Sequence, residues 1–147
     1  MYKVTKLFKV PIGHRLSCHK GLCKNIHGHN LKIEVEVSCE ELNENGMVID
    51  FADLKSMTNE IIDEWDHALF INFMDQEIVK KGKVMIPVFD PKKVIVLPSE
   101  PTAENLCEHL AHELIKKFMG KKLDYLKVES ISIWENDDSK ATYIPPP

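Results

Sequence analysis

Apolar and polar residues alternate without a break from residue 30 to residue 37. Side chains two positions apart in a strand point to the same face, so this pattern predicts a half-buried strand over residues 29–39. A mixed apolar and basic pattern over residues 2–10 predicts a first strand, which Pro11 and Gly13 end. The core side of the second strand should consist of Leu31, Ile33, Val35 and Val37.

Residues 15–26 follow no hydrophobic period and are predicted to form a loop between these strands. Such a loop lets the second strand return antiparallel to the first. The hairpin would then bring His14, at the end of the first strand, next to His27 and His29, at the start of the second.

Two later segments carry apolar residues at helical spacing. Asp50 is the predicted N-cap of the first helix, which should end near residues 66–67. Thr102 is the predicted N-cap of the second helix, and Gly120 should stop it. The two apolar stripes are Phe51, Leu54, Met57, Ile61, Ile62 and Trp65, and then Ala103, Leu106, Leu110, Ala111, Leu114 and Phe118.

The remaining strands complete an α+β order. Residues 126–135 are predicted to form a third main strand, and residues 141–144 close a final hairpin with it. Between the helices, residues 84–89 and 94–97 are predicted to form a small extra hairpin, with Pro87 confining its strand to an edge. We therefore expect one domain over residues 1–147, with an antiparallel four-stranded sheet in the order ββααββ.

Two imidazoles at the entrance of the second strand suggest metal chemistry. His27 and His29 project from the same face, and Gly28 between them adds no bulk. A catalytic zinc site takes three protein ligands and keeps a fourth position open, and His14 is the candidate for the third ligand. The thiol of Cys23 lies four residues upstream of His27 and could sit beside the open position.

Other interpretations of these residues remain open. A His-x-His pair is often a surface feature, and Cys18, Cys23, His27 and His29 could instead form a closed structural zinc knuckle, although their spacing does not match common zinc fingers. On the second helix, His109 and His112 have no third partner nearby and are interpreted as surface residues.

Composition narrows the choice of partners. The net charge is −4 and no basic block is present, so nucleic acid is not favoured. No apolar run approaches the roughly 20 residues of a membrane span, and the N-terminus lacks the apolar core of a signal peptide. We expect a cytoplasmic protein whose four cysteines are reduced.

Several short blocks, taken in order, resemble one family. The chain resembles the 6-pyruvoyltetrahydropterin synthase and 6-carboxytetrahydropterin synthase family over nearly its whole length. The blocks are Gly13-His14-Arg15-Leu16, Cys23-x-x-x-His27-Gly28-His29, Gly46-Met47-Val48-Ile49-Asp50-Phe51, Leu54-Lys55, Asp66-His67, Pro101-Thr102-Ala103-Glu104-Asn105 and Glu135.

The resemblance implies the tunnelling fold, in which two helices cover one face of an antiparallel sheet. It also implies a homo-oligomer in which subunits join their sheets into a trimeric barrel and two trimers stack as a hexamer. Closing the ring would remove the exposed sheet edges. Active sites would then lie between subunits.

The resemblance further implies a role for each site residue. His14, His27 and His29 would hold Zn²⁺, and Cys23 would be the catalytic thiol. Asp66 and His67 would complete the proton-transfer set and would reach Cys23 from a neighbouring subunit. Glu135 would anchor the pterin, and Thr102 would border its pocket.

Three functions remain to be compared. The expected one is a lyase that converts 7,8-dihydroneopterin triphosphate to 6-carboxy-5,6,7,8-tetrahydropterin, with loss of acetaldehyde and triphosphate, for queuosine-type 7-deazaguanine synthesis. The nearest alternative is 6-pyruvoyltetrahydropterin synthase, which eliminates triphosphate and uses the same residues. A non-catalytic zinc-stabilised binding module is the third. A family member that makes a folate precursor carries Glu in place of the thiol, so Cys23 argues against it.

Overall fold

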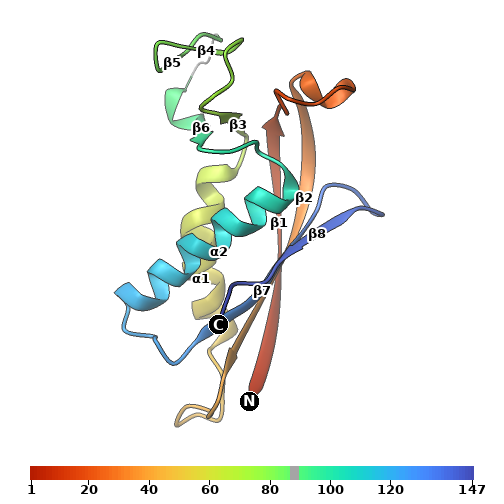
Figure 1. Cartoon of the computed structure of the whole chain (residues 1–147). Helices are drawn as coiled ribbons and strands as arrows, with labels where there is room; N and C mark the ends of the chain where they lie inside the picture. The colour runs from red at the N-terminus through yellow and green to blue at the C-terminus, as the bar shows by residue number, and fades with distance from the viewer. Residues whose placement is uncertain (87–89) are drawn as a thin grey trace.

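The computed structural model describes residues 1–86 and 90–147 (Figure 1). Within these residues the helices are α1 (Phe51–Trp65) and α2 (Ala103–Gly120), with short 3₁₀ turns η1 (Leu22–Lys24) and η2 (Pro91–Lys93). The strands are β1 (Tyr2–His14), β2 (His27–Cys39), β3 (Ala68–Asn72), β4 (Val79–Lys80), β5 (Lys83–Val84), β6 (Val94–Leu97), β7 (Lys127–Trp134) and β8 (Lys140–Tyr143).

The four predicted main strands pair as expected. β1 and β2 are antiparallel, with partners running from Tyr2 opposite Cys39 to His14 opposite His27. β7 pairs antiparallel with β2, and β8 pairs antiparallel with β7. The predicted α+β fold is confirmed and these four strands are antiparallel, but the sheet has six strands and is mixed, not four-stranded and wholly antiparallel.

Two further strands extend this sheet beyond β1. β3 runs parallel to β1 and β6 runs parallel to β3, which gives the order β6-β3-β1-β2-β7-β8. The expected pairing of residues 94–97 with residues 84–89 is therefore wrong, because β6 pairs with β3; residues 87–89 lie outside the described part of the chain. A short apolar run such as β6 does not reveal its partner, since the pattern is the same for either neighbour. A small hairpin between the helices is present at other residues, where β4 pairs with β5.

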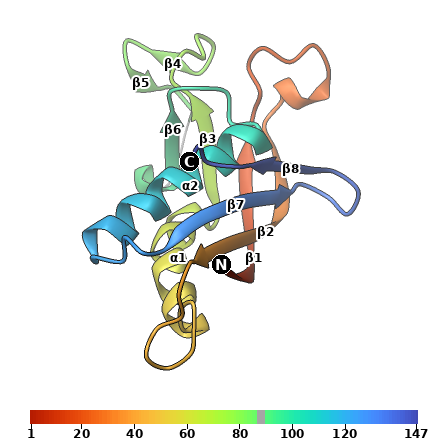
Figure 2. The same cartoon turned by 60° about the horizontal axis from the view of Figure 1, so that its bottom comes forward.

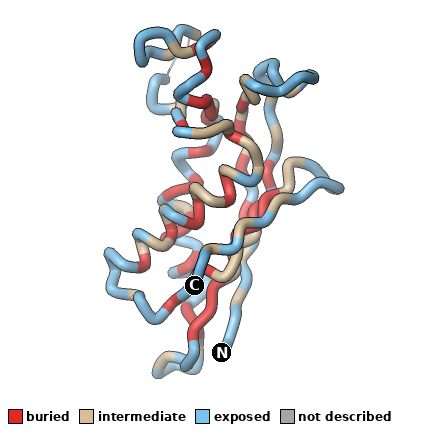
Figure 3. Tube along the Cα trace, in the orientation of Figure 1, coloured by how far each residue is buried: buried red, intermediate tan, exposed pale blue. Residues whose placement is uncertain are grey.

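Both helices pack on one face of the curled sheet (Figures 1 and 2). Leu31, Ile33 and Val35 of β2 are fully buried beneath them, as the alternation predicts. The buried segments of both helices and of the central strands face one another in Figure 3. Trp65 at the end of α1 meets Phe70 of β3 edge to face, with ring centroids 5.1 Å apart, and so joins the helix layer to the added strands.

Both predicted N-caps are confirmed. The side chain of Asp50 accepts a hydrogen bond from the backbone of Ala52, and that of Thr102 accepts one from Asn105. Each cap satisfies an amide that the first helical turn leaves free. In the described residues, no helix is both long and apolar enough to span a lipid bilayer.

Candidate metal centre and active site

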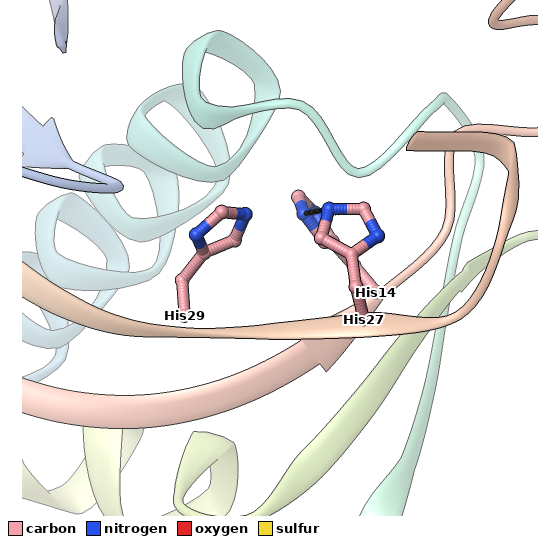
Figure 4. A group of neighbouring side chains, drawn as sticks. All are labelled: His14, His27 and His29. Atoms are coloured by element: carbon pink, nitrogen blue, oxygen red, sulfur yellow. Dashed lines mark hydrogen bonds between the residues drawn. The ribbon is translucent and has the colours of Figure 1, made fainter. Parts of the chain in front are cut away.

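The β1–β2 pairing brings three histidines together, as the hairpin prediction required. His14 ends β1 directly opposite His27, which begins β2, and His29 lies opposite Ile12. Directly opposed residues of two strands point to the same face, so the three imidazoles project into one space (Figure 4). The ring centroids are 4.5 to 5.1 Å apart.

This cluster has the size of a metal site. One nitrogen from each ring lies within 4.8 Å of the others, and the Nε2 atoms of His14 and His27 are 3.0 Å apart. Two bonds of 2.0–2.1 Å at a tetrahedral angle place their nitrogens about 3.3 Å apart. The preformed spacing is therefore close to the spacing that a bound ion needs.

Hydrogen bonds fix which ring nitrogens face the centre. Nδ1 of His14 lies 2.7 Å from the carbonyl oxygen of Pro101, and Nδ1 of His27 lies 2.7 Å from that of Asn25. A carbonyl only accepts, so each Nδ1 must carry the proton and donate. Each Nε2 of the neutral rings then presents a lone pair, and two lone pairs 3.0 Å apart repel unless a cation lies between them. The residues present thus fit a bound metal ion.

Burial favours the ligand form of the innermost ring. His14 is 1% exposed. Burial lowers the pKa of His14, although the Pro101 carbonyl and Glu135 oppose the shift. The neutral imidazole that results is the form that binds a metal.

Glu135 lies beside the cluster. Its carboxylate oxygens are 3.8 Å from Nε2 of His14 and 3.9 Å from Nε2 of His29. The side chain is half-buried. Glu135 and Thr102 also line one hollow of about 300 Å³, together with Leu16 and Lys140. The two residues predicted to contact a pterin therefore share a cavity next to the histidines.

Cys23 lies in η1, on the loop between β1 and β2, and is half-buried. The carbonyl oxygen of Cys23 accepts a hydrogen bond of 2.8 Å from the backbone of Leu16, which closes the neck of the loop. Among residues 1–86 and 90–147, the side chains that could hold a metal are the three histidines, and neither Cys18 nor Cys23 joins them. In the described residues, Cys18 and Cys23 are therefore not grouped with the histidines as a closed zinc knuckle would require.

Asp66 and His67 form a pair directly after α1, where Asp66 is the C-cap residue. Nδ1 of His67 is 2.5 Å from Oδ1 of Asp66, and the two side chains are 81% and 52% exposed respectively. The backbone N–H of His67 donates to Pro11 of β1. Within one chain, the described contacts of this pair do not include Cys23 or the histidine cluster.

His67 also has unusual backbone geometry. Its φ is +58°, in the left-handed region that glycine normally supplies after a helix. A side chain held there costs stability, and Lys81 and Lys122 also adopt this conformation.

One histidine differs from its prediction. His109 is half-buried and stacks on Trp65, with ring centroids 6.1 Å apart and planes 16° apart, so its interpretation as a surface residue is wrong. Burial lowers the pKa of His109. The apolar stripe of α2 did not predict this contact, because His109 lies at the edge of the stripe and its partner, Trp65, belongs to α1. His112 is exposed, as predicted.

Sequence patterns missed the groups that orient the ligands. The acceptors for His14 and His27 are backbone carbonyls of Pro101 and Asn25. Every residue carries such a carbonyl, so no residue type marks these positions.

Comparisons with known proteins agree with this geometry. Residues 3–146 match the family model described as 6-pyruvoyl tetrahydropterin synthase. The 6-carboxy-5,6,7,8-tetrahydropterin synthase of Rickettsia bellii is 35% identical over 136 residues, which cover 92% of this chain and 94% of that protein. The protein of the same name from Haemophilus influenzae is 34% identical over 148 residues, covering 97% of this chain and 99% of that one.

Solved structures show the same fold. An uncharacterized protein from Wolinella succinogenes superposes with a TM-score of 0.78 at 22% identity, covering 99% of this chain and 98% of its own. The 6-pyruvoyl tetrahydropterin synthase of Plasmodium falciparum superposes with a TM-score of 0.73 at 21% identity, covering 97% and 96%. The chain therefore belongs to the 6-pyruvoyl tetrahydropterin synthase family and is a lyase.

Proposed function

We propose that this enzyme is a zinc-dependent lyase that converts 7,8-dihydroneopterin triphosphate to 6-carboxy-5,6,7,8-tetrahydropterin, with release of acetaldehyde and triphosphate. The relatives from Rickettsia bellii and Haemophilus influenzae carry the name of that product. The single observation that carries the proposal is the convergence of two Nε2 lone pairs and a third imidazole beside the Glu135 carboxylate.

Zinc suits this donor set. Three neutral imidazoles leave one tetrahedral position for substrate or water, as in catalytic zinc sites. His14 and His27 each donate through Nδ1 to a carbonyl, which fixes the ring orientation and strengthens the ligand. When bound, zinc would act as a Lewis acid toward the side-chain hydroxyls of the substrate and make the adjacent C–H more acidic.

The protein's own groups would bind the substrate and move its protons. The carboxylate of Glu135 would accept two hydrogen bonds from the amino and ring N–H groups of the pterin, and Thr102 borders the same hollow. The thiolate of Cys23 would take the proton from carbon. His67, oriented by Asp66 at 2.5 Å, would relay the proton onward.

The exposed position of the Asp66–His67 pair supports an assembled active site. We propose that the pair acts on Cys23 of a neighbouring copy, in trimers that stack as a hexamer. The six-stranded sheet has two outer strands, β6 and β8, and ring closure would cover such edges.

A second candidate function is 6-pyruvoyltetrahydropterin synthase, since the matching family model carries that description. The metal and the thiol would serve either reaction, so their geometry does not separate the two. The carbon balance does, because the first reaction releases a two-carbon aldehyde and the second keeps those carbons.

The test is a product assay. Purified, zinc-loaded protein is incubated with 7,8-dihydroneopterin triphosphate, and acetaldehyde and the pterin product are measured. Acetaldehyde in equal amount to 6-carboxytetrahydropterin is expected. A pyruvoyl product without acetaldehyde would select the second candidate, and no turnover of this substrate would refute both. The further assignment to 7-deazaguanine synthesis is tested by whether the product feeds the next enzyme of that route.

A further inference from the structure

Glu100, in the segment between β6 and α2, holds together three parts of the chain. One carboxylate oxygen accepts from the backbone N–H of Ser17 at 2.8 Å. The other accepts from the hydroxyl of Ser17 and from the side-chain amide of Asn72, the latter at 2.9 Å. We call Glu100, Ser17 and Asn72 the Glu100 clamp.

The carboxylate of Glu100 in the clamp is ionised. Burial alone would raise the pKa of Glu100, but the hydrogen bonds from Ser17 and Asn72 outweigh burial and lower it. The carboxylate is therefore ionised near neutral pH, and hydrogen bonds to an ionised acceptor are roughly twice as strong as neutral ones.

On one side, the clamp fixes the loop that carries Cys23. Ser17 directly follows Leu16, whose backbone N–H donates to the carbonyl of Cys23 at 2.8 Å. No residue of η1 is buried, so packing contributes little to the position of this turn. Its position depends on a few hydrogen bonds, and those of Ser17 with Glu100 lie at the neck of the loop.

On the other side, the same segment orients a proposed metal ligand. The carbonyl of Pro101, the next residue, accepts from Nδ1 of His14 at 2.7 Å. The carbonyl of Glu100 itself accepts from Thr102 at 2.9 Å and from the side chain of Asn105 at 2.8 Å. Residues 100–102 are thereby tied to the start of α2.

We propose that Glu100 is a positioning residue that sets the distance and direction of the Cys23 thiol relative to the three-histidine centre. This inference rests on the proposed function of Cys23 and the histidines. One short segment holds the loop through Ser17 and His14 through Pro101, so the thiol and the metal ligands share a common support. Proton transfer from carbon is sensitive to such alignment, because misplacement by about 1 Å can cost 100-fold in rate.

The kinetic test compares Glu100→Ala with Glu129→Ala. Glu129 is a matched control, because its carboxylate also binds a serine hydroxyl, that of Ser38 at 2.7 Å, but near the far end of β2. For Glu100→Ala, kcat should fall by roughly 10- to 100-fold while KM changes by less than about threefold. The zinc content should stay at the wild-type level. Glu129→Ala should lower the melting temperature without this fall in kcat.

Two milder variants keep the test informative if Glu100→Ala does not fold. Ser17→Ala removes the hydroxyl donor and keeps the backbone donor, so its kcat should fall by less than that of Glu100→Ala. Glu100→Gln keeps one acceptor oxygen but replaces the other with an N–H₂ that faces a donor, and it removes the charge, so its kcat should fall, by less than that of Glu100→Ala. If Glu100→Gln and Ser17→Ala both keep wild-type kcat, the proposal is wrong.

A second readout does not depend on turnover. In a Cys18→Ser background, the alkylation rate of Cys23 by iodoacetamide is measured across pH; Cys39 and Cys107 are buried. Glu100→Ala should change the rate or its pH midpoint, and Glu129→Ala should not. Equal profiles for all three proteins would overturn the proposal. If the wild type turns over no pterin, the proposed function fails, yet the alkylation profiles still decide the role of Glu100.

Discussion

The two groups of candidate catalytic residues are built in opposite ways. The three histidines lie on one hairpin, and the innermost of them, His14, is almost fully buried and hydrogen-bonded to a carbonyl. The Asp66–His67 pair follows α1 and faces solvent, with His67 81% exposed. A single chain thus brings the three candidate metal ligands together, whereas the described contacts of the proposed proton-transfer pair include neither Cys23 nor the histidines.

The largest effects should separate metal binding from chemistry. His14→Ala should lose both zinc and activity, because it removes the buried imidazole whose hydrogen bond to Pro101 leaves Nε2 free to bind the metal. Cys23→Ala should lower kcat by at least about 1,000-fold, yet retain one zinc per chain. Zinc content by atomic absorption and turnover on the same samples check this. Zinc loss in Cys23→Ala would instead make the thiol a ligand.

Mixing two inactive variants tests whether the exposed pair acts between copies. Cys23→Ala and His67→Ala subunits are unfolded together and reassembled in equal amounts. If each site draws Cys23 from one copy and His67 from another, random assembly should restore activity to about one quarter of wild type. Recovery no greater than the sum of the separate variants would place both residues in the same chain.

Replacing His67 should change stability and activity in opposite directions. His67→Gly relieves a left-handed conformation, so the free energy of unfolding should rise by about 0.5–1 kcal/mol. The same change should lower kcat by about 100-fold or more, since the proton relay is lost. Urea unfolding and steady-state kinetics measure the two effects. A more stable variant with normal kcat would show that His67 has no catalytic role.

The smallest effect concerns a histidine outside both groups. Burial lowers the pKa of His109 in the folded chain, so the unfolded state binds its proton more readily. Stability from this group is full above the unfolded pKa of about 6.5 and is lost progressively as the pH falls from there through the lower pKa of the folded state. His109→Phe keeps the stack on Trp65 and should reduce the acid loss of melting temperature by on the order of 1 °C. If the melting temperature of His109→Phe depends on pH as that of the wild type does, groups other than His109 cause the acid loss of stability.

The sequence predicts the hairpin and the three histidines well because strand period and short-range pairing bring them together. Leu31 and Ile33 mark the buried face, and the loop after His14 leaves little choice of partner for β2. It fails for β3 and β6, because parallel partners are chosen by tertiary packing such as that of Phe70 on Trp65. It also misses Glu100, whose partners Ser17 and Asn72 lie 83 and 28 residues away, a separation that no local pattern records.

We propose that three imidazoles, and no sulfur, hold the metal. X-ray absorption at the zinc edge of the purified enzyme measures this directly. Three nitrogen neighbours at about 2.0–2.1 Å are expected, with oxygen from water or substrate in the open position. A sulfur neighbour at about 2.3 Å would contradict it, because Cys23 would then be a metal ligand and not a free base.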